Sequence, residues 1–260
     1  METTIDDKNQ NQNYIPILIS TKLIYKGRFI SYFINNFQTI NQNKKIITPY
    51  EAVDYNSRIF SQNEIQNEFI GKNSYNIYAV NIIPIIKYSS EPKKIIIVSV
   101  FRYPINKFCI EFPAGFMDKT DINKDGKDNF IESIKKSALR ELEEETGYKG
   151  KFICFSSTFF GKNLNLKEEL KIGSNIFFDP WKSSDNAIQC IVEIDGDNIL
   201  NKNNQKLDDT EFIQVFEVEI EKLMEFINDK MNKEKCGCSC ELYNFALGLN
   251  FNNILNNTII

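Results

Sequence analysis

The 260-residue sequence predicts an α/β (α+β) protein, in which helices cover a central mixed β-sheet. Short runs of β-branched and aromatic residues dominate the first half, one amphipathic helix is expected near the middle, and two more helices are expected near the C-terminus. Hydrophobic residues make up 42% of the chain and charged residues 25%, which is typical of a globular protein with a buried core.

Seven segments have the composition and length of β-strands. They are rich in Ile, Val, Phe and Tyr, and they are separated by polar segments rich in Asn and Lys, which favour loops. The expected strands span residues 22–33, 46–55, 75–87, 94–102, 152–155, 187–194 and 212–218.

An amphipathic helix is expected over residues 129–145. Its apolar residues recur at helical spacing, with charged residues on the other faces: Ile131, Ile134, Ala138 and Leu142. Gly147 follows this segment, where a glycine suits the left-handed conformation that ends many helices. Two further helices are expected over residues 219–230 and 241–252.

The composition excludes several classes of function. Histidine is absent, which removes Ser-His-Asp and Cys-His catalysis, His-ligated zinc and imidazole general bases. The net charge of -4 and the pI near 5.2 argue against a nucleic-acid partner. The N-terminal apolar run is too short for a secretory signal, and a chain of this length does not need its six cysteines as disulfides. We therefore expect a cytoplasmic protein, with the nucleus as the alternative, and no membrane partner.

Three glutamates on the expected central helix form a candidate metal site. Glu141 and Glu145 are four residues apart and stand on one face of the helix, and Glu144 lies close beside them. Like charges at this spacing repel one another, and a hard divalent ion such as Mg²⁺ would relieve the repulsion through oxygen ligands. The alternative is a solvated acidic face, the usual explanation for an isolated run of glutamates.

The spacing around these glutamates favours the metal site. Gly126 is followed after five residues by Glu132, and after seven more by Arg140-Glu141-Leu142-Glu143-Glu144-Glu145-Thr146-Gly147-Tyr148. This pattern fills every fixed position of the Nudix box, so the chain resembles the Nudix hydrolase family. The resemblance implies an α/β/α sandwich around a central mixed sheet, and a hydrolase that acts with Mg²⁺, for which Mn²⁺ can substitute.

Segments outside the box extend the resemblance to the ADP-ribose and ADP-sugar pyrophosphatase branch, most closely to its animal type. The matching segments are Phe101-Arg102-Tyr103-Pro104, Glu111-Phe112-Pro113-Ala114-Gly115 and Asp208-Asp209-Thr210-Glu211-Phe212. The branch implies Mg-dependent hydrolysis of the pyrophosphate bond of ADP-ribose or a related ADP-sugar, giving AMP and a sugar 5-phosphate. A nucleotide sugar is thus the expected small-molecule partner.

The resemblance also implies roles for individual residues. Glu141, Glu144, Glu145 and the backbone carbonyl of Ala114 are expected to hold the metal, with Glu144 and Arg140 counted among the catalytic residues. Arg140 is expected to pair with a box carboxylate.

Three further residues are assigned to substrate and water. Glu111 is expected near the metal and substrate, and Arg102 on a diphosphate oxygen or the terminal ribose, the alternative being a plain surface arginine. Glu211 is the expected general base, the alternative being an exposed loop acid. The chemistry is an attack on phosphorus by a water molecule that a carboxylate deprotonates.

The N-terminal strands are expected to bind adenine and to form a homodimer. Phe29 and Tyr50, the latter followed by Glu51, occupy the places where related enzymes stack the base between aromatic rings from two chains. Packing of these rings into a core is the alternative. The expected organisation is a disordered polar tail over residues 1–15, the strand region over 16–65, and the Nudix domain over 66–260, with insertions near 119–126 and 160–175.

Several alternatives stay open at this point. The substrate could be another nucleoside diphosphate derivative, such as NADH, a GDP-sugar or a damaged nucleotide, or the chain could be an inactive Nudix binding module. Residues 121–132 also match the oxygen-ligand positions of an EF-hand calcium loop, although no helix precedes them. Cys236, Cys238 and Cys240 could bind a soft metal, but their spacing matches no common zinc pattern.

Overall fold

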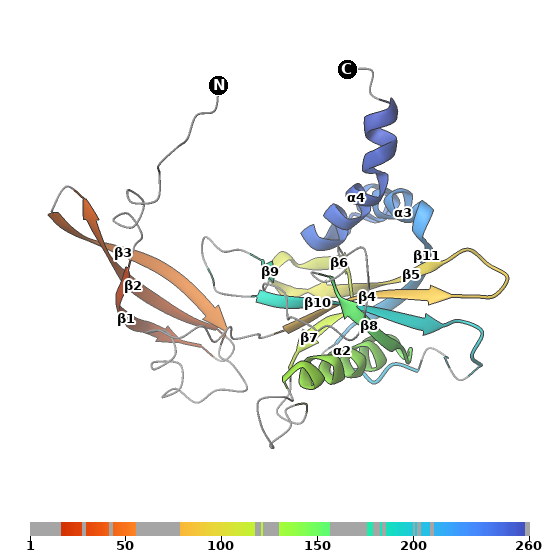
Figure 1. The fold of residues 1–260 in the computed structure, drawn as a ribbon, viewed down its shortest axis with the longest axis horizontal. Helices are drawn as coiled ribbons and strands as arrows, with labels where there is room; N and C mark the ends of the chain where they lie inside the picture. Colours follow the sequence, from red (N-terminus) through yellow and green to blue (C-terminus); the bar gives the residue numbers. More distant parts are fainter. Residues whose placement is uncertain are drawn as a thin grey trace, which may run out of the picture. The chain divides into compact units, whose positions relative to one another are not determined.

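The chain divides into two compact units in the computed structural model (Figure 1). One unit comprises Met1–Asn76 with Phe177–Asn186, and the other comprises Ile77–Ile176 with Ala187–Ile260. The structure describes residues 17–27, 30–41, 44–55, 79–117, 121, 130–156, 176–178, 183, 186–199, 201, 204–208 and 211–257.

The first unit contains a three-stranded antiparallel sheet in the order β1-β2-β3. Its strands are β1 (Ile17–Lys26), β2 (Ile30–Asn41) and β3 (Lys44–Tyr55). The sequence placed one strand over residues 22–33, which was wrong, because the chain reverses within that segment. At the reversal the Gly27 amide donates a hydrogen bond of 2.9 Å to the Ile30 carbonyl, and a Cβ at Gly27 would lie 2.7 Å from that oxygen.

Much of the apolar surface of this small sheet is exposed. Ile17, Tyr25 and Ile47 are 59%, 66% and 60% exposed. Exposed apolar side chains thus lie on both edge strands of this sheet, β1 and β3.

The second unit is built on a mixed nine-stranded sheet. Its main order is β12-β6-β5-β4-β10-β8, with β11 paired to β5, β7 to β4 and β9 to β10. The β10–β4 and β12–β6 pairs are parallel, while β5 pairs antiparallel with β4, β6 and β11. The strands are β4 (Ala79–Lys87), β5 (Lys94–Arg102), β6 (Lys107–Glu111), β7 (Ala114–Phe116), β8 (Lys151–Phe155), β9 (Ile176–Phe177), β10 (Asn186–Asp195), β11 (Ile213–Glu219) and β12 (Gly237–Cys238).

Helices cover both faces of this sheet (Figure 1). α2 (Phe130–Thr146) lies on one face, and α3 (Leu223–Asn232) and α4 (Cys240–Asn257) lie on the other; the short 3-10 turns are η2 (Tyr103–Ile105) and η5 (Ile220–Lys222). α2 buries Ile134, Ala138 and Leu142 completely, as its helical spacing predicted. The α/β/α arrangement around a mixed sheet is therefore confirmed.

Residues of α3 and α4 complete the core on the opposite face. Leu223, Ile227, Leu242 and Ala246 are fully buried against Ile95 and its neighbours in the sheet. Among the described residues, no helix is long and apolar enough to cross a membrane.

Candidate active site

α2 presents the predicted acidic residues at its C-terminal end, beside strand β7. The helix stops where expected: Gly147 has a φ of 75°, and its amide donates a hydrogen bond of 2.8 Å to the Glu143 carbonyl. Residues four apart share a face, so Glu141 and Glu145 both point toward β7. Ala114, the first residue of β7, donates its amide hydrogen to Glu145 Oε2 over 3.0 Å.

Gly115 brings β7 into direct contact with the helix. A Cβ at this position would lie 2.0 Å from the carboxyl carbon of Glu141 and 2.2 Å from Oε2. No real Cβ approaches so closely, hence only glycine permits this packing. The sequence pattern placed the box glycine at Gly126, which lies outside the described residues. The signal that could have found Gly115 was present, because it closes the segment Glu111-Phe112-Pro113-Ala114-Gly115.

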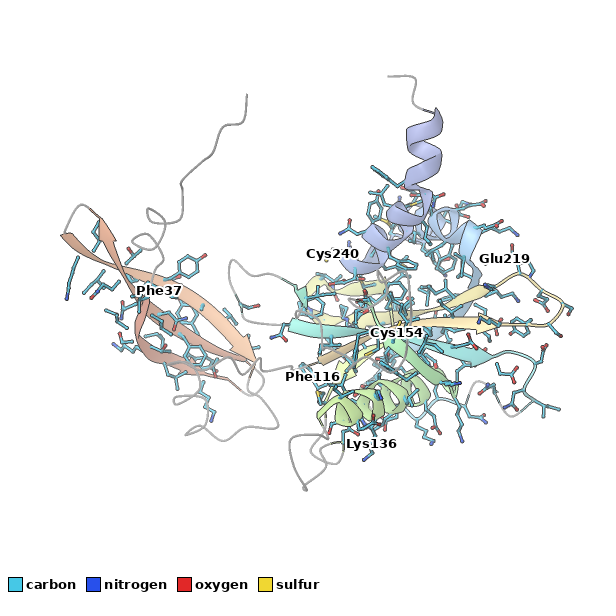
Figure 2. All side chains as sticks on the ribbon, viewed as in Figure 1. Phe37, Phe116, Lys136, Cys154, Glu219 and Cys240 are labelled. Atoms are coloured by element: carbon cyan, nitrogen blue, oxygen red, sulfur yellow. The ribbon has the colours of Figure 1, made fainter. Side chains whose placement is uncertain are left out.

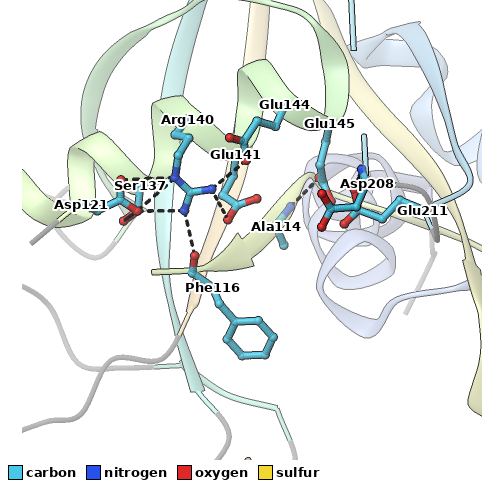
Figure 3. A network of polar contacts seen from close by, with 10 residues as sticks. All are labelled: Ala114, Phe116, Asp121, Ser137, Arg140, Glu141, Glu144, Glu145, Asp208 and Glu211. Atoms are coloured by element: carbon cyan, nitrogen blue, oxygen red, sulfur yellow. Dashed lines mark hydrogen bonds and ion pairs between the residues drawn. The ribbon is translucent and has the colours of Figure 1, made fainter. Parts of the chain in front are cut away.

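Arg140 joins the acidic residues to the neighbouring strand and loop (Figure 3). Its Nη1 lies 2.8 Å from both Glu141 Oε1 and Glu144 Oε2, which confirms the expected pairing with box carboxylates. Its Nη2 donates hydrogen bonds of 2.9 Å to the Phe116 carbonyl and 2.8 Å to Asp121 Oδ2. One guanidinium therefore fixes two glutamates of the helix.

Asp121 is a further partner of Arg140, and no sequence pattern indicated this pairing. Its side chain is fully buried, and it accepts hydrogen bonds from Arg140 Nε and Nη2 and from Ser137 Oγ at 2.8 Å. The calcium template used Asp121 and Glu132 as its two ends, but Glu132 is ion-paired with Lys135 instead. Both described ends of that template thus bind other side chains.

Burial changes the acidity of two of the glutamates. It raises the pKa of Glu141 to about 7, against the opposing charge and hydrogen bond of Arg140. Burial also raises the pKa of Glu145 to about 8, against the hydrogen bond from the Ala114 amide. Carboxyl groups held in a low-dielectric site favour the neutral form unless a cation accompanies them.

The carboxylate oxygens on α2 are ligands of the kind that a hard divalent cation prefers. Glu141 and Glu145 supply carboxylate oxygens on one helix face, and a cation between them would offset the cost of ionising buried groups. Within the described residues, no three acidic or cysteine side chains already converge as a cation cage. Glu141 and Glu144 turn to Arg140 instead, and Glu145 turns to Ala114. The role of the Ala114 carbonyl as a ligand stays a prediction.

Arg102 and Glu111 form a two-pronged ion pair at the ends of β5 and β6. Arg102 Nε lies 2.9 Å from Glu111 Oε1, and Nη2 lies 2.5 Å from Oε2. Glu111 is mostly buried and Arg102 is nearly half exposed. The charge of Glu145 acts on Arg102, so the pair belongs to the same electrostatic site as α2.

Glu211 lies on the far side of Glu145 from Arg140 (Figure 3). It precedes β11 and is exposed, and its Oε2 accepts a hydrogen bond of 3.0 Å from the Asp208 amide. Its negative charge acts on Glu145 and favours the protonated form of that group. The predicted base thus lies beside the predicted metal ligands.

The second unit gathers most of the predicted site residues. They are Arg102, Glu111, Ala114, Arg140, Glu141, Glu144, Glu145 and Glu211. Tyr50 and Glu51 lie on β3 of the first unit, where Tyr50 is 46% exposed rather than packed in a core. Glu51 accepts a hydrogen bond from the Tyr32 hydroxyl and thereby raises the pKa of that phenol. Phe29 lies outside the described residues.

The cysteines are all free thiols. Figure 2 shows Cys154 in the sheet and Cys240 at the start of α4. Burial raises the pKa of Cys109 and of Cys238 to about 12, which makes these thiols poor nucleophiles and poor metal ligands at neutral pH. The free thiols agree with the reduced cysteines expected from the sequence.

Comparisons with known proteins give a consistent group of relatives. The chain is 31% identical to an ADP-ribose pyrophosphatase of Saccharomyces cerevisiae over 182 residues, which cover 68% of this chain and 65% of the yeast protein. It is 31% identical to an uncharacterized Nudix hydrolase of Schizosaccharomyces pombe over 67% of this chain and 71% of that protein. It is 30% identical to an ADP-sugar pyrophosphatase of Mus musculus over 66% of each chain.

The chain therefore spans slightly less than two thirds of the length of the yeast and mouse relatives. A solved structure of an ADP compounds hydrolase superposes with a TM-score of 0.49 at 11% identity, covering 90% of this chain and 94% of that one. No protein-family model matches the chain.

Proposed function

This chain belongs to the Nudix hydrolase family, and we propose that it hydrolyses the pyrophosphate bond of ADP-ribose or a related ADP-sugar to AMP and a sugar 5-phosphate. The yeast and mouse relatives that carry this activity in their names motivate the choice of substrate. The single observation that carries the proposal is the pair of buried carboxyl groups, Glu141 and Glu145, held between Arg140 and β7.

Glu141, Glu144 and Glu145 would hold Mg²⁺, with the Ala114 carbonyl as a further oxygen donor. The cation supplies positive charge that offsets the diphosphate and lowers the pKa of nearby water. Mn²⁺ can replace it, because both ions accept oxygen ligands.

The side chains of the protein have separate tasks in this proposal. Arg140 orients Glu141 and Glu144 through its two contacts at 2.8 Å. Arg102 binds an oxyanion of the substrate with the edge of its guanidinium that Glu111 leaves free, since arginine presents several donors in a fixed plane. Glu111 keeps Arg102 in place and charged.

Glu211 acts as the general base. It is exposed and can exchange protons with solvent, and it lies beside Glu145 (Figure 3). Its Oε1 or Oε2 removes a proton from the water, whose oxygen forms a new bond to the phosphorus on the sugar side, and AMP leaves with the electron pair of the P–O bond that breaks. The absence of histidine leaves this task to a carboxylate.

The N-terminal strands bind the adenine end and form a homodimer. Tyr50 offers an exposed ring for stacking, and Glu51 lies next to it on β3. The exposed apolar residues of β1 and β3 supply the surface that a second copy would cover. Sedimentation velocity at micromolar concentration should show a dimer, and a monomer would overturn this part.

A substrate panel tests the main proposal. Purified protein with Mg²⁺ is incubated with ADP-ribose, ADP-glucose, NADH, a GDP-sugar and an oxidised nucleoside triphosphate, and the products are separated by ion-exchange chromatography. We expect AMP from the ADP-sugars at the highest kcat/KM. Pyrophosphate release from a triphosphate as the fastest reaction would overturn the substrate class, and no turnover with any compound would overturn the enzymatic function.

A further inference from the structure

The last turn of α2 is closed by the segment that leads to Glu211. Carbonyl groups in the last turn of a helix lack partners within the helix and need others. Here the Glu144 carbonyl accepts a hydrogen bond of 2.8 Å from the Lys206 amide, and the Glu145 carbonyl accepts one of 2.6 Å from Gln205 Nε2. Two consecutive residues thus attach this segment to the end of the catalytic helix.

The Gln205 side chain makes a second hydrogen bond, which runs to β11 instead of α2. Its Nε2 also donates to the Ile213 carbonyl over 3.1 Å, and Ile213 is the first residue of β11. A glutamine amide carries two N–H donors, so both bonds can form at once. One side chain therefore connects the end of α2 to the start of β11.

The candidate base lies between these two attachment points. Asp208 and Glu211 fall between Gln205 and Ile213 in the chain and are bonded to each other twice, through Glu211 N to Asp208 O at 2.9 Å and Asp208 N to Glu211 Oε2 at 3.0 Å. Among the described residues of this segment, Gln205 and Lys206 make hydrogen bonds to the end of α2, and Gln205 bonds to the backbone of Glu145 itself. Gln205 is thus the side chain through which the placement of Glu211 relative to Glu145 can be altered.

We propose that Gln205 is a positioning residue that fixes the Asp208–Glu211 pair against the C-terminal end of α2, and thereby places Glu211 beside Glu145. The expected effect of Gln205 on catalysis rests on the proposed function, whereas its effect on the placement of the Asp208–Glu211 pair does not. Gln205 lies outside the box and outside the three segments that first indicated the family.

The test replaces Gln205 with methionine, which keeps the length of the side chain and removes both donors. The matched control is Gln214→Met, the same replacement at an exposed position one residue into β11. The hydrogen bond from the Lys206 amide to the Glu144 carbonyl remains in both variants, as does the Lys206–Glu143 ion pair. The segment should therefore stay near the helix while its exact placement is lost.

Hydrogen–deuterium exchange in metal-free protein is the first readout. In Gln205→Met, peptides covering residues 204–213 should exchange about tenfold faster or more, while peptides of β4 and β10 exchange as in the wild type. Gln214→Met should match the wild type throughout. Unchanged exchange of residues 204–213 in Gln205→Met would overturn the proposal, whether or not the protein hydrolyses ADP-sugars.

Kinetics provide the second readout. For Gln205→Met we expect kcat to fall by about 10- to 100-fold with KM within about threefold, because a shift of the base by about 1 Å costs this much in the chemical step. In a Glu211→Gln background the same replacement should change kcat by less than about twofold, since coupled residues are not additive. If the loss of kcat in the double variant equals the product of the two single losses, the assignment of Gln205 to Glu211 is overturned.

Failure of the proposed function looks different. If the wild-type protein releases no AMP, the proposed function fails before any variant is compared. The exchange measurement then still decides whether Gln205 holds the segment in place. Faster exchange with unchanged kcat would overturn the positioning role.

Discussion

The carboxyl group of Glu141 packs directly on the backbone of Gly115, so that a methyl group on residue 115 would lie 2.0 Å from the carboxyl carbon. This contact brings α2 and β7 closer together than any other residue type permits. The Ala114–Glu145 hydrogen bond and the Arg140–Phe116 hydrogen bond both depend on that approach.

Gly115→Ala should therefore abolish turnover. The new methyl group displaces Glu141 or moves β7, and we expect kcat/KM to fall by at least about 100-fold, a loss of about 2.7 kcal/mol in transition-state stabilisation. The control is Gly248→Ala in α4, where an added Cβ meets nothing within 4 Å. That variant should keep full activity and gain about 0.5–1 kcal/mol of unfolding free energy. Activity of Gly115→Ala within tenfold of the wild type would contradict the packing.

Asp121 should matter more for stability than its position in an insertion suggests. Its fully buried carboxylate faces the partly buried Arg140, and Asp121→Ala leaves that arginine with fewer partners. Loss of one member of a buried ion pair costs about 3–5 kcal/mol, and we expect the low end because Glu141 and Glu144 still bind Arg140. Chemical denaturation measures the loss. Glu132→Gln, which breaks an exposed pair with Lys135, should cost less than about 1 kcal/mol.

The central helix was the most predictable part of the fold. The apolar residues of α2 repeat at helical spacing over its whole length, so its bounds agree with the expected range to within one residue at each end of the described helix. The long strands β5 and β10 were also found, because β5 is buried on both faces as a nearly continuous apolar run and β10 alternates buried apolar residues with partly buried ones. Residue pattern along one segment carries such signals.

Short strands and the division of β1 from β2 were missed for physical reasons. β7 has three residues and β12 has two, too few to show a periodic pattern. β1 and β2 are joined near Gly27, and a single glycine within an aromatic and β-branched run gave too weak a turn signal.

The site was predictable where a fixed spacing encodes it and not where tertiary contact does. Arg140, Glu141, Glu144 and Glu145 follow from their spacing on one helix. Asp121 and Gln205 have no such spacing to a partner. Their roles come from contacts with α2 that are made from a distance along the chain, which local sequence does not specify.

Glu145→Gln should remove activity without unfolding the protein. The substitution deletes one negative charge from the proposed metal site and relieves a buried carboxyl group. We expect kcat to fall by more than about tenfold at saturating Mg²⁺, a cost above about 1.4 kcal/mol. Glu143→Gln on the same helix, which contacts Lys206 at the surface, is the matched control and should keep its activity. Equal kcat in the two variants would argue against the metal assignment.

The raised pKa values of Glu141 and Glu145 predict how stability responds to pH and to Mg²⁺. Both groups titrate near 4.5 when unfolded, and near 7 and 8 in the fold. Between these values the folded state binds more protons than the unfolded state, so unfolding free energy falls as pH rises from about 4.5 to about 8. The metal-free protein in EDTA should lose on the order of 2 kcal/mol or more over this interval.

Added Mg²⁺ should reverse that loss. A cation binds the ionised carboxylates, so its stabilising effect should grow with pH and be largest near pH 8. Thermal unfolding with EDTA and with Mg²⁺ at matched ionic strength measures this increment. In Glu145→Gln the slope in EDTA should be shallower. An increment that is constant across pH would show that Mg²⁺ binds elsewhere.

Glu211→Gln should separate catalysis from binding. Glutamine keeps the size of the side chain and can still accept the hydrogen bond from the Asp208 amide, but it cannot accept a proton from water at neutral pH. We expect single-turnover rates to fall by about 100-fold or more while the dissociation constant for ADP-ribose stays within about threefold, because a general base acts in the chemical step. Glu221→Gln in η5 is the matched exposed control and should behave as the wild type.

With no histidine in the chain, the rise of the rate with pH must come from a carboxylate, a water molecule near the cation or another non-imidazole group. The measurement runs from pH 6 to pH 9 at saturating Mg²⁺. If Glu211→Gln stays within about threefold of the wild type over that range, the base lies elsewhere, and Glu111 or a glutamate of the box is the next candidate. Glu111, whose pairing with Arg102 places it near Glu145, would then be replaced by glutamine and measured in the same way.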